Sequence, residues 1–145
     1  MLNNDLCKFE IRKKPYMPYN LRIFVLDDDM SRILWFQENF KSVSFAFDPV
    51  KAWNILKNEE YNFDIIFLDH DLGGAFTRGS KGDGIDLARQ MAKEGVYKNT
   101  RIIVHSRNPQ GAQAIEEALK ETHTNIELIN YLNLREIVVN EKFTI

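Results

Sequence analysis

The chain has very little cysteine, since Cys7 is the only one among its 145 residues. A single thiol excludes an internal disulfide and any zinc site built from several thiolates. Long apolar runs are missing too: no segment is long enough to span a bilayer, and residues 1–14 lack the apolar core of a signal peptide. We therefore expect a soluble, cytoplasmic protein that does not bind membranes.

No charge of one sign dominates, because 19 Lys and Arg residues are set against 21 Asp and Glu residues, for a formal net charge of -2. This mixture predicts no broad basic surface and argues against tight binding to duplex DNA. One small anionic ligand held at a metal ion is compatible with it. The length predicts one domain with a core of its own, and it says nothing about oligomeric state.

Apolar runs and amphipathic stretches alternate from Leu21 onward. Before that point, Pro15, Pro18 and mixed polarity indicate an N-terminal extension over residues 1–20, followed by a domain over residues 21–145. The predicted strands are 23–26, 43–47, 65–68, 102–104 and 126–129. The predicted helices are 30–40, 49–57, 85–93, 110–121 and 132–139.

Strands that alternate with helices predict an α/β fold, a three-layer sandwich around a parallel five-stranded sheet. In such sheets ligands bind at the carboxyl ends of the strands, at the point where the strand order reverses. We expect the flavodoxin-like order 2-1-3-4-5, in which the first and third strands flank that point.

Aspartates follow both of these strands. Asp27 and Asp28 come after the first strand, and Asp69 and Asp71 after the third. Clustered carboxylates repel one another unless a cation neutralises them, so the group favours a hard divalent ion, Mg²⁺ or Mn²⁺. The alternative for any one aspartate is a helix cap, a role that suits Asp29.

Two histidines belong to the same edge of the predicted sheet. His70 lies between two of the aspartates, where it could ligate a metal, donate to a phosphate or move protons near neutral pH. Alternatively, it faces solvent beside a carboxylate. His105 and Ser106 end the fourth strand, and because side chains alternate along a strand, one faces the site while the other packs sideways.

Ser106, Arg107 and Asn108 lead into a helix whose first turn contains Pro109 and Gly111. Amides at a helix start bind anions, so these three residues are candidates for phosphate binding. The alternatives are that Asn108 only caps the helix and that Arg107 is only solvated.

Two further segments are less specific. The loop 73–84 carries Arg78 and Lys81, and it could close over a nucleotide or be a flexible insertion. His123 lies in a polar stretch and is expected to be exposed.

The motifs around the aspartates resemble those of response-regulator receiver domains over residues 21–140. LDDD at 26–29 resembles the receiver's acidic pair, DIIFLD at 64–69 resembles the strand that ends in the phospho-accepting aspartate, and GDGI at 82–85 resembles the turn before the next helix. Receivers carry a lysine, usually followed by proline, after the fifth strand. Here residues 128–132 read LINYL, without either.

LDHDLGG at 68–74 and HSRNPQGA at 105–112 are similar to a receiver-derived family, the cyclic-phosphate-processing receiver domains. The resemblance implies action on a cyclic phosphate of a nucleotide or an RNA terminus, in RNA repair or nucleotide-based immunity. It also implies that Asp71 contributes to a metal site only through its backbone carbonyl.

Three functions stay open. The first is a metal-dependent phosphoesterase with Asp69, His70 and His105 as catalytic residues. The second is a stand-alone receiver that a histidine kinase phosphorylates on Asp69. The third is a protein that binds a cyclic nucleotide without turnover.

Overall fold

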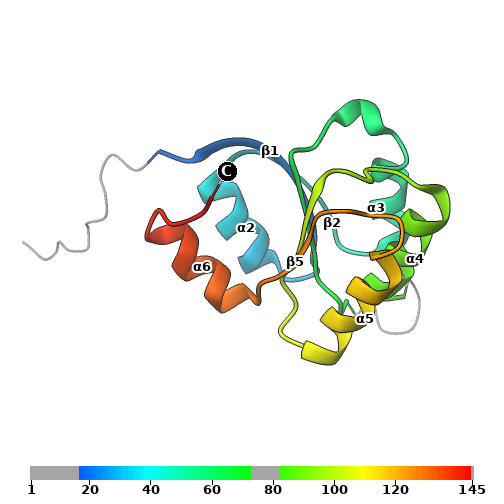
Figure 1. Cartoon of the computed structure of the whole chain (residues 1–145). Helices are drawn as coiled ribbons and strands as arrows, with labels where there is room; N and C mark the ends of the chain where they lie inside the picture. The colour runs from blue at the N-terminus through cyan, green and yellow to red at the C-terminus, as the bar shows by residue number, and fades with distance from the viewer. Residues whose placement is uncertain (1–16, 73–81, 145) are drawn as a thin grey trace, which may run out of the picture.

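The structure is a computed structural model, and it describes residues 17–72 and 82–144. Five parallel strands form one sheet in the order β2-β1-β3-β4-β5, with helices on both faces (Figure 1). The predicted flavodoxin-like three-layer sandwich is therefore confirmed. Most of the N-terminal extension and the loop residues Arg78 and Lys81 lie outside the described residues.

The elements follow one another as strand and helix along the chain. The strands are β1 (Tyr19–Leu26), β2 (Phe40–Ala46), β3 (Ile65–Leu68), β4 (Arg101–Val104) and β5 (Ile126–Leu128). The helices are α2 (Met30–Asn39), α3 (Pro49–Leu56), α4 (Gly84–Glu94), α5 (Pro109–Leu119) and α6 (Tyr131–Val139), with one 3-10 turn, η1 (Glu59–Tyr61). Of the described helices, none is long and apolar enough to cross a membrane.

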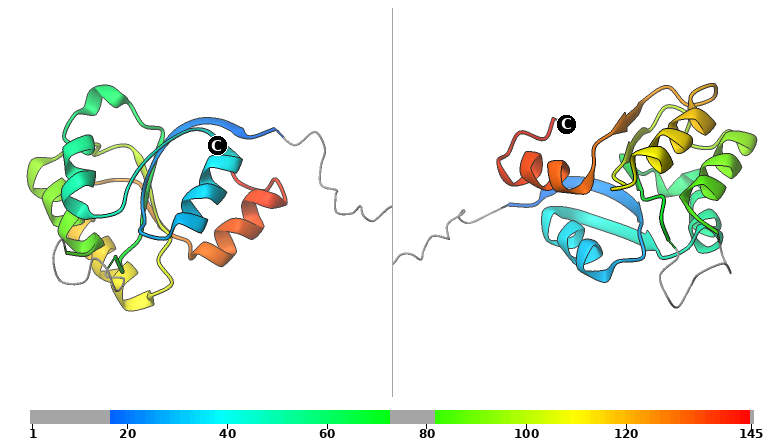
Figure 2. Two further views of the ribbon diagram at one scale, coloured as in Figure 1. Left: turned by 180° about the vertical axis from the view of Figure 1, so that it is seen from behind. Right: turned by 90° about the horizontal axis from the view of Figure 1, so that it is seen from below.

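The sheet separates two apolar cores, because successive side chains of each strand point to opposite faces. Helices α3, α4 and α5 cover one face, and α2 and α6 cover the other (Figure 2). In β3, Ile66 and Leu68 join the first core while Ile65 and Phe67 join the second. All four residues are buried, as expected of a central parallel strand covered on both sides.

The strand boundaries that were predicted least well are those of β1 and β2. β1 begins at Tyr19 because its first residues pair with β2 through a register shift between Tyr19 and Arg22, and exposed polar residues hide this part of the strand. β2 begins at Phe40, directly after α2. The Phe40 ring is buried against the ring of Phe67, so tertiary packing overrides the helical periodicity that predicted a longer helix.

His123 was expected to be exposed, and this prediction is wrong. Only 3% of the residue is exposed. Its Nε2 donates to the carbonyl of Val96 at 2.7 Å, and its Nδ1 meets the Thr122 hydroxyl at 2.8 Å. One local hydrogen bond and one to a distant segment thus satisfy the ring in the core, and burial lowers the pKa of His123.

Gly84 is the first residue of α4, where the helix comes closest to the end of β3. Its amide donates to the carbonyl of His70 at 2.8 Å. A Cβ added to Gly84 would lie only 2.0 Å from the carbonyl oxygen of Asp69. The absence of a side chain at this position therefore sets the distance between α4 and the strand end that carries Asp69.

We predict that Gly84→Ala lowers the free energy of unfolding by about 3 kcal/mol, because the backbone of Asp69 or the start of α4 must shift. Urea denaturation followed by circular dichroism measures the loss. Gly95→Ala is the control, because a Cβ there meets only the flexible Lys98 side chain at 3.6 Å and costs only the strain of a positive φ. Equal losses in the two variants would contradict the close approach at Gly84.

Candidate functional site

Three aspartates converge at the carboxyl ends of β1 and β3. The amides of Asp27 and Asp69 continue the hydrogen bonding of the sheet, to the carbonyls of Ala46 at 3.2 Å and Leu26 at 3.0 Å, so the sheet itself fixes their positions. One carboxylate oxygen from each of Asp27, Asp28 and Asp69 lies within 4.8 Å of the others. We call these three residues the acidic cluster.

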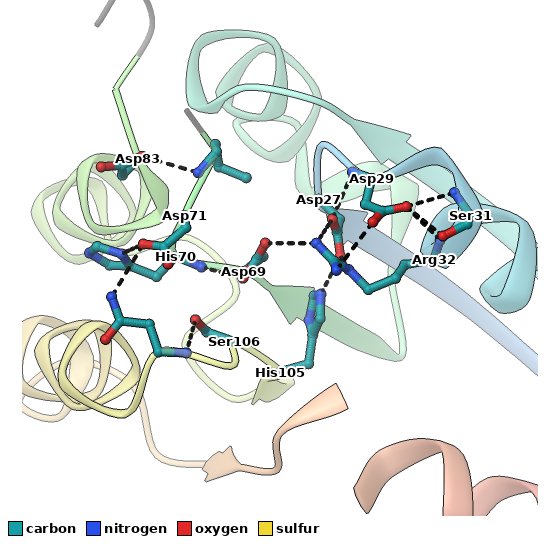
Figure 3. A network of polar contacts seen from close by, with 12 residues as sticks. Asp27, Asp29, Ser31, Arg32, Asp69, His70, Asp71, Asp83, His105 and Ser106 are labelled. Atoms are coloured by element: carbon teal, nitrogen blue, oxygen red, sulfur yellow. Dashed lines mark hydrogen bonds and ion pairs between the residues drawn. The ribbon is translucent and has the colours of Figure 1, made fainter. Parts of the chain in front are cut away.

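Arg32, in the first turn of α2, places its guanidinium in the acidic cluster (Figure 3). Its Nε and Nη2 donate to the two oxygens of Asp27 at 2.8 and 2.9 Å. Nη2 also lies 3.4 Å from Oδ2 of Asp69, and Nη1 lies 3.3 Å from Asp29. Arg32 was not predicted as a site residue from the sequence. The signal that was available is its place three residues after the helix cap Asp29, beside the strand that ends in Asp27.

His105 approaches Asp27 from the interior of the protein. Its Nε2 donates to Oδ2 of Asp27 at 2.8 Å, and neither side chain is exposed. The ring lies edge-on to Phe36 and Phe67, on the same face of the sheet as Ile103. The structure thus turns His105 toward the α2 and α6 layer, where it contacts Asp27 and is shielded from solvent.

The pKa values of the two buried aspartates of the cluster, Asp27 and Asp69, are shifted in opposite directions. Burial alone would raise the pKa of Asp27, but hydrogen bonds from His105 and Arg32 lower it to about 2. Burial raises the pKa of Asp69 to about 6, and the nearby negative charge of Asp27 adds to this effect. Asp27 is therefore a stable anion, whereas the charge on Asp69 is incompletely compensated by the residues around it.

His70 and Asp71 form a separate pair on the other side of Asp69 (Figure 3). Nδ1 of His70 lies 2.7 Å from Oδ1 of Asp71, and Nδ2 of the Asn108 side chain donates to the same oxygen at 3.3 Å. The hydrogen bond with His70 lowers the pKa of Asp71. Asp71, predicted as a metal ligand, is not part of the acidic cluster, because its side chain is held by these two partners.

Some hydrogen-bonding groups of the predicted phosphate-binding residues are already used within the protein. Oδ1 of Asn108 accepts from the amide of Gly111 at 3.0 Å, so Asn108 caps α5, and Pro109 has no amide hydrogen to offer. Ser106 is buried, and its hydroxyl oxygen accepts from the amide of Asn108 at 3.1 Å while its proton can still be donated. Arg107 is exposed.

The end of β5 carries no lysine. β5 ends at Leu128, and the side chain of Asn130 accepts from the amide of Asn133 at 3.0 Å to cap α6. The segment directly after β5 thus carries a helix cap in place of the lysine of the receiver pattern. Among the described residues, Arg32 is the only lysine or arginine that forms an ion pair with Asp27 or Asp69.

A family model described as the cyclic-phosphate processing receiver domain matches residues 21–121. The chain belongs to this family. No curated protein sequence matches it significantly. The matched residues include the acidic cluster, His70 and the start of α5.

Solved structures show the same fold at low sequence identity. The receiver domain of the Francisella response regulator 1452 is 24% identical with a TM-score of 0.52, and the alignment covers 86% of this chain and all of that chain. The Thermotoga maritima response regulator TrrA, solved in complex with Mg²⁺ and BeF, is 18% identical with a TM-score of 0.53, over 84% of this chain and 96% of that one. A CheY-like receiver domain from Methylobacillus flagellatus is 14% identical with a TM-score of 0.53, and the alignment covers 84% of this chain and 98% of that one.

We predict that Asp69→Asn stabilises the metal-free domain at pH 7.5 by about 1–3 kcal/mol. Folding raises the pKa of Asp69 from 3.8 to about 6. Between these values the folded state binds more protons than the unfolded state, so this group's contribution to stability falls as the pH rises. The gain should therefore shrink as the pH is lowered toward 4. Urea denaturation in the presence of a chelator measures it.

Asp64→Asn is the matched control, because Asp64 precedes the same strand at its opposite end, where it accepts from the amide of Arg22 at 2.8 Å. This variant should show no gain. An Asp69→Asn domain that is no more stable than the unsubstituted one at pH 7.5 would contradict the electrostatic description of the site.

Proposed function

We propose that this receiver domain is a metal-dependent phosphoesterase that opens cyclic phosphates of nucleotides or RNA ends. The observation that carries the proposal is the acidic cluster at the switch point of the sheet, in a chain of the cyclic-phosphate processing family. Ligands of parallel α/β folds bind at this edge.

The acidic cluster fits a divalent cation. Its donors are carboxylate oxygens, which Mg²⁺ and Mn²⁺ prefer, and the guanidinium of Arg32 already shows that a positive charge is stable there. Asp27, Asp28 and Asp69 are the residues that would hold the ion. When bound, it would withdraw negative charge from the phosphate oxygens of a ligand.

His70 is the residue that we assign to proton transfer. Asp71 accepts from Nδ1 and fixes the ring, which leaves Nε2 to give a proton to the leaving ribose oxygen or to take one from water. The side chain of His70 is 17% exposed, whereas that of His105 is fully buried against Asp27. His105 therefore acts as a positioning residue that holds Asp27. Ser106 would donate its hydroxyl proton to a phosphate oxygen.

The direct test is incubation with 2′,3′-cyclic mononucleotides and with signalling cyclic nucleotides, in Mg²⁺ or Mn²⁺, with ring opening followed by chromatography. We expect a ring-opened monophosphate product. Asp69→Asn should reduce turnover by at least about 100-fold, and Asp64→Asn should leave it unchanged. No product from any of these compounds, or full turnover by Asp69→Asn, would contradict the proposal.

The two histidines should respond differently to substitution. His70→Gln should lower kcat by about 100-fold or more and remove one limb of the pH–rate profile, with little change in Tm. His105→Gln should lower Tm, because the buried Asp27 loses a hydrogen bond. Equal effects of both variants on Tm and kcat would contradict this division of roles.

Phosphorylation of Asp69 as in a stand-alone receiver is a second candidate, favoured by the receiver fold and by the position of Asp69 at the end of β3. The missing lysine after β5 argues against it, because no cation there can respond to the phosphoryl group. Incubation with acetyl phosphate and Mg²⁺ tests it by mass spectrometry. An increase of about 80 Da, one HPO₃ unit, would support it.

Binding without turnover is distinguished in the same assays. Stoichiometric retention of a cyclic nucleotide, with neither a ring-opened product nor a gain in protein mass, would favour a binding protein over both candidates.

A further inference from the structure

Asp27 has no lone pair left for a metal ion in this structure. Oδ1 accepts from the amide of Asp29 at 2.9 Å and from Nη2 of Arg32 at 2.9 Å. Oδ2 accepts from Nε of Arg32 at 2.8 Å and from Nε2 of His105 at 2.8 Å. Each carboxylate oxygen offers about two acceptor sites, so both are fully used. Asp27 cannot coordinate a cation unless one of these donors leaves.

Arg32 is the donor that can leave. The Asp29 amide is part of the backbone at the start of α2, and the His105 ring is enclosed between strand and helix. The Arg32 side chain, in contrast, is 20% exposed at the edge of the site. Its guanidinium also lies 3.4 Å from Asp69, so the same movement would uncover an oxygen of Asp69.

The position of Arg32 is not explained by helix stability. A cation in the first turn of a helix is unfavourable, because the helix macrodipole is positive at that end. Salt bridges to three aspartates offset this cost. The carboxylates, and not α2, therefore determine where the guanidinium lies.

An aromatic ring that can bind a cation lies beside Arg32. The Cζ of Arg32 lies 5.7 Å from the centre of the Tyr131 ring, at the start of α6, so this ring is within reach of the guanidinium. A planar guanidinium binds phosphate oxygens in bidentate fashion. No other described lysine or arginine pairs with Asp69, and the end of β5 offers no cation.

We propose that Arg32 and the divalent cation exchange places on Asp27, and that the displaced guanidinium then binds the phosphate of the ligand. The inference rests on the metal site of the proposed function and adds to it the residue that takes over the part of the absent lysine. Without metal, Arg32 compensates part of the negative charge of the cluster; with metal bound, it supplies a phosphate contact.

The exchange is tested by titrating the metal-free domain with Mn²⁺ in a calorimeter at pH 7.5. Arg32→Gln removes the competing charge, so this variant should bind Mn²⁺ about tenfold or more tightly than the unsubstituted domain. In chelator, the Tm of Arg32→Gln should be lower than the Tm of the unsubstituted domain. Added Mn²⁺ should raise the Tm of Arg32→Gln by more than it raises the Tm of the unsubstituted domain. Arg135→Gln is the matched control, because the Cζ of Arg135, on α6 itself, lies 5.8 Å from the centre of the same Tyr131 ring. It should leave the Mn²⁺ affinity unchanged.

The outcomes separate the exchange from the metal site. If the unsubstituted domain binds Mn²⁺ and Arg32→Gln binds it no more tightly, the exchange is wrong and the metal site stands. If neither binds Mn²⁺, both are wrong. Should Arg32→Gln not fold without metal, Arg32→Lys replaces it. That variant keeps the charge but loses the bidentate contact, and an affinity for Mn²⁺ equal to that of the unsubstituted domain would overturn the exchange.

The phosphate contact has its own measurement. In saturating Mn²⁺, inorganic phosphate should bind Arg32→Gln about tenfold more weakly than the unsubstituted domain, while Arg135→Gln binds it equally well. Unchanged phosphate affinity in Arg32→Gln would overturn this part of the proposal.

Discussion

The buried carboxylate of Asp27 is the constraint around which the site is built. None of its side chain is exposed, and a charge in that position is stable only with full hydrogen bonding. Arg32 and His105 supply most of that bonding, one from α2 and the other from the position directly after β4. These contacts link β1, the first helix and the fourth strand at one edge of the sheet. They also leave Asp69 as the carboxylate whose charge most needs a further partner.

Two groups of side chains flank Asp69 and divide the chemistry between them. Oδ2 of Asp69 lies toward Arg32 and the acidic cluster, where charge can be compensated. Oδ1 accepts from the amide of His70, whose ring belongs to the pair with Asp71. Asp69 thus has Arg32 on one side and the His70–Asp71 pair on the other. In the proposed phosphoesterase, the first side would compensate the charge of the phosphate and the second would transfer protons.

Most of the fold was predictable from the sequence, because apolar strands and capped helices are local signals. Ile65–Leu68 was predicted to the residue, and Asp29 and Asn108 do cap helices. The convergence of Asp27 with Asp69 followed from topology alone, since both end neighbouring parallel strands. The start of β1 was missed, because its pairing depends on a bulge that no local pattern shows.

The partners of the site residues were less predictable. Arg32 reads in the sequence as an ordinary helix residue, and only the turn between β1 and α2 directs it back to Asp27. The choice between His105 and Ser106 depended on which face of β4 is turned toward Asp27. His105 continues the alternation and shares the face of Ile103, but the strand pattern alone does not show which face contacts Asp27. His123 shows the same limit, because its hydrogen bond with Val96 joins segments 27 residues apart.

The central claim is that one divalent cation binds at the ends of β1 and β3. Paramagnetic broadening of backbone amide signals by substoichiometric Mn²⁺ tests it most directly. The claim predicts that amides of residues 27–29 and 69–71 lose intensity first, while those at the opposite edge of the sheet, such as Asp64 and Asn125, keep theirs. Broadening spread evenly over the surface, or centred anywhere else on the domain, would contradict it.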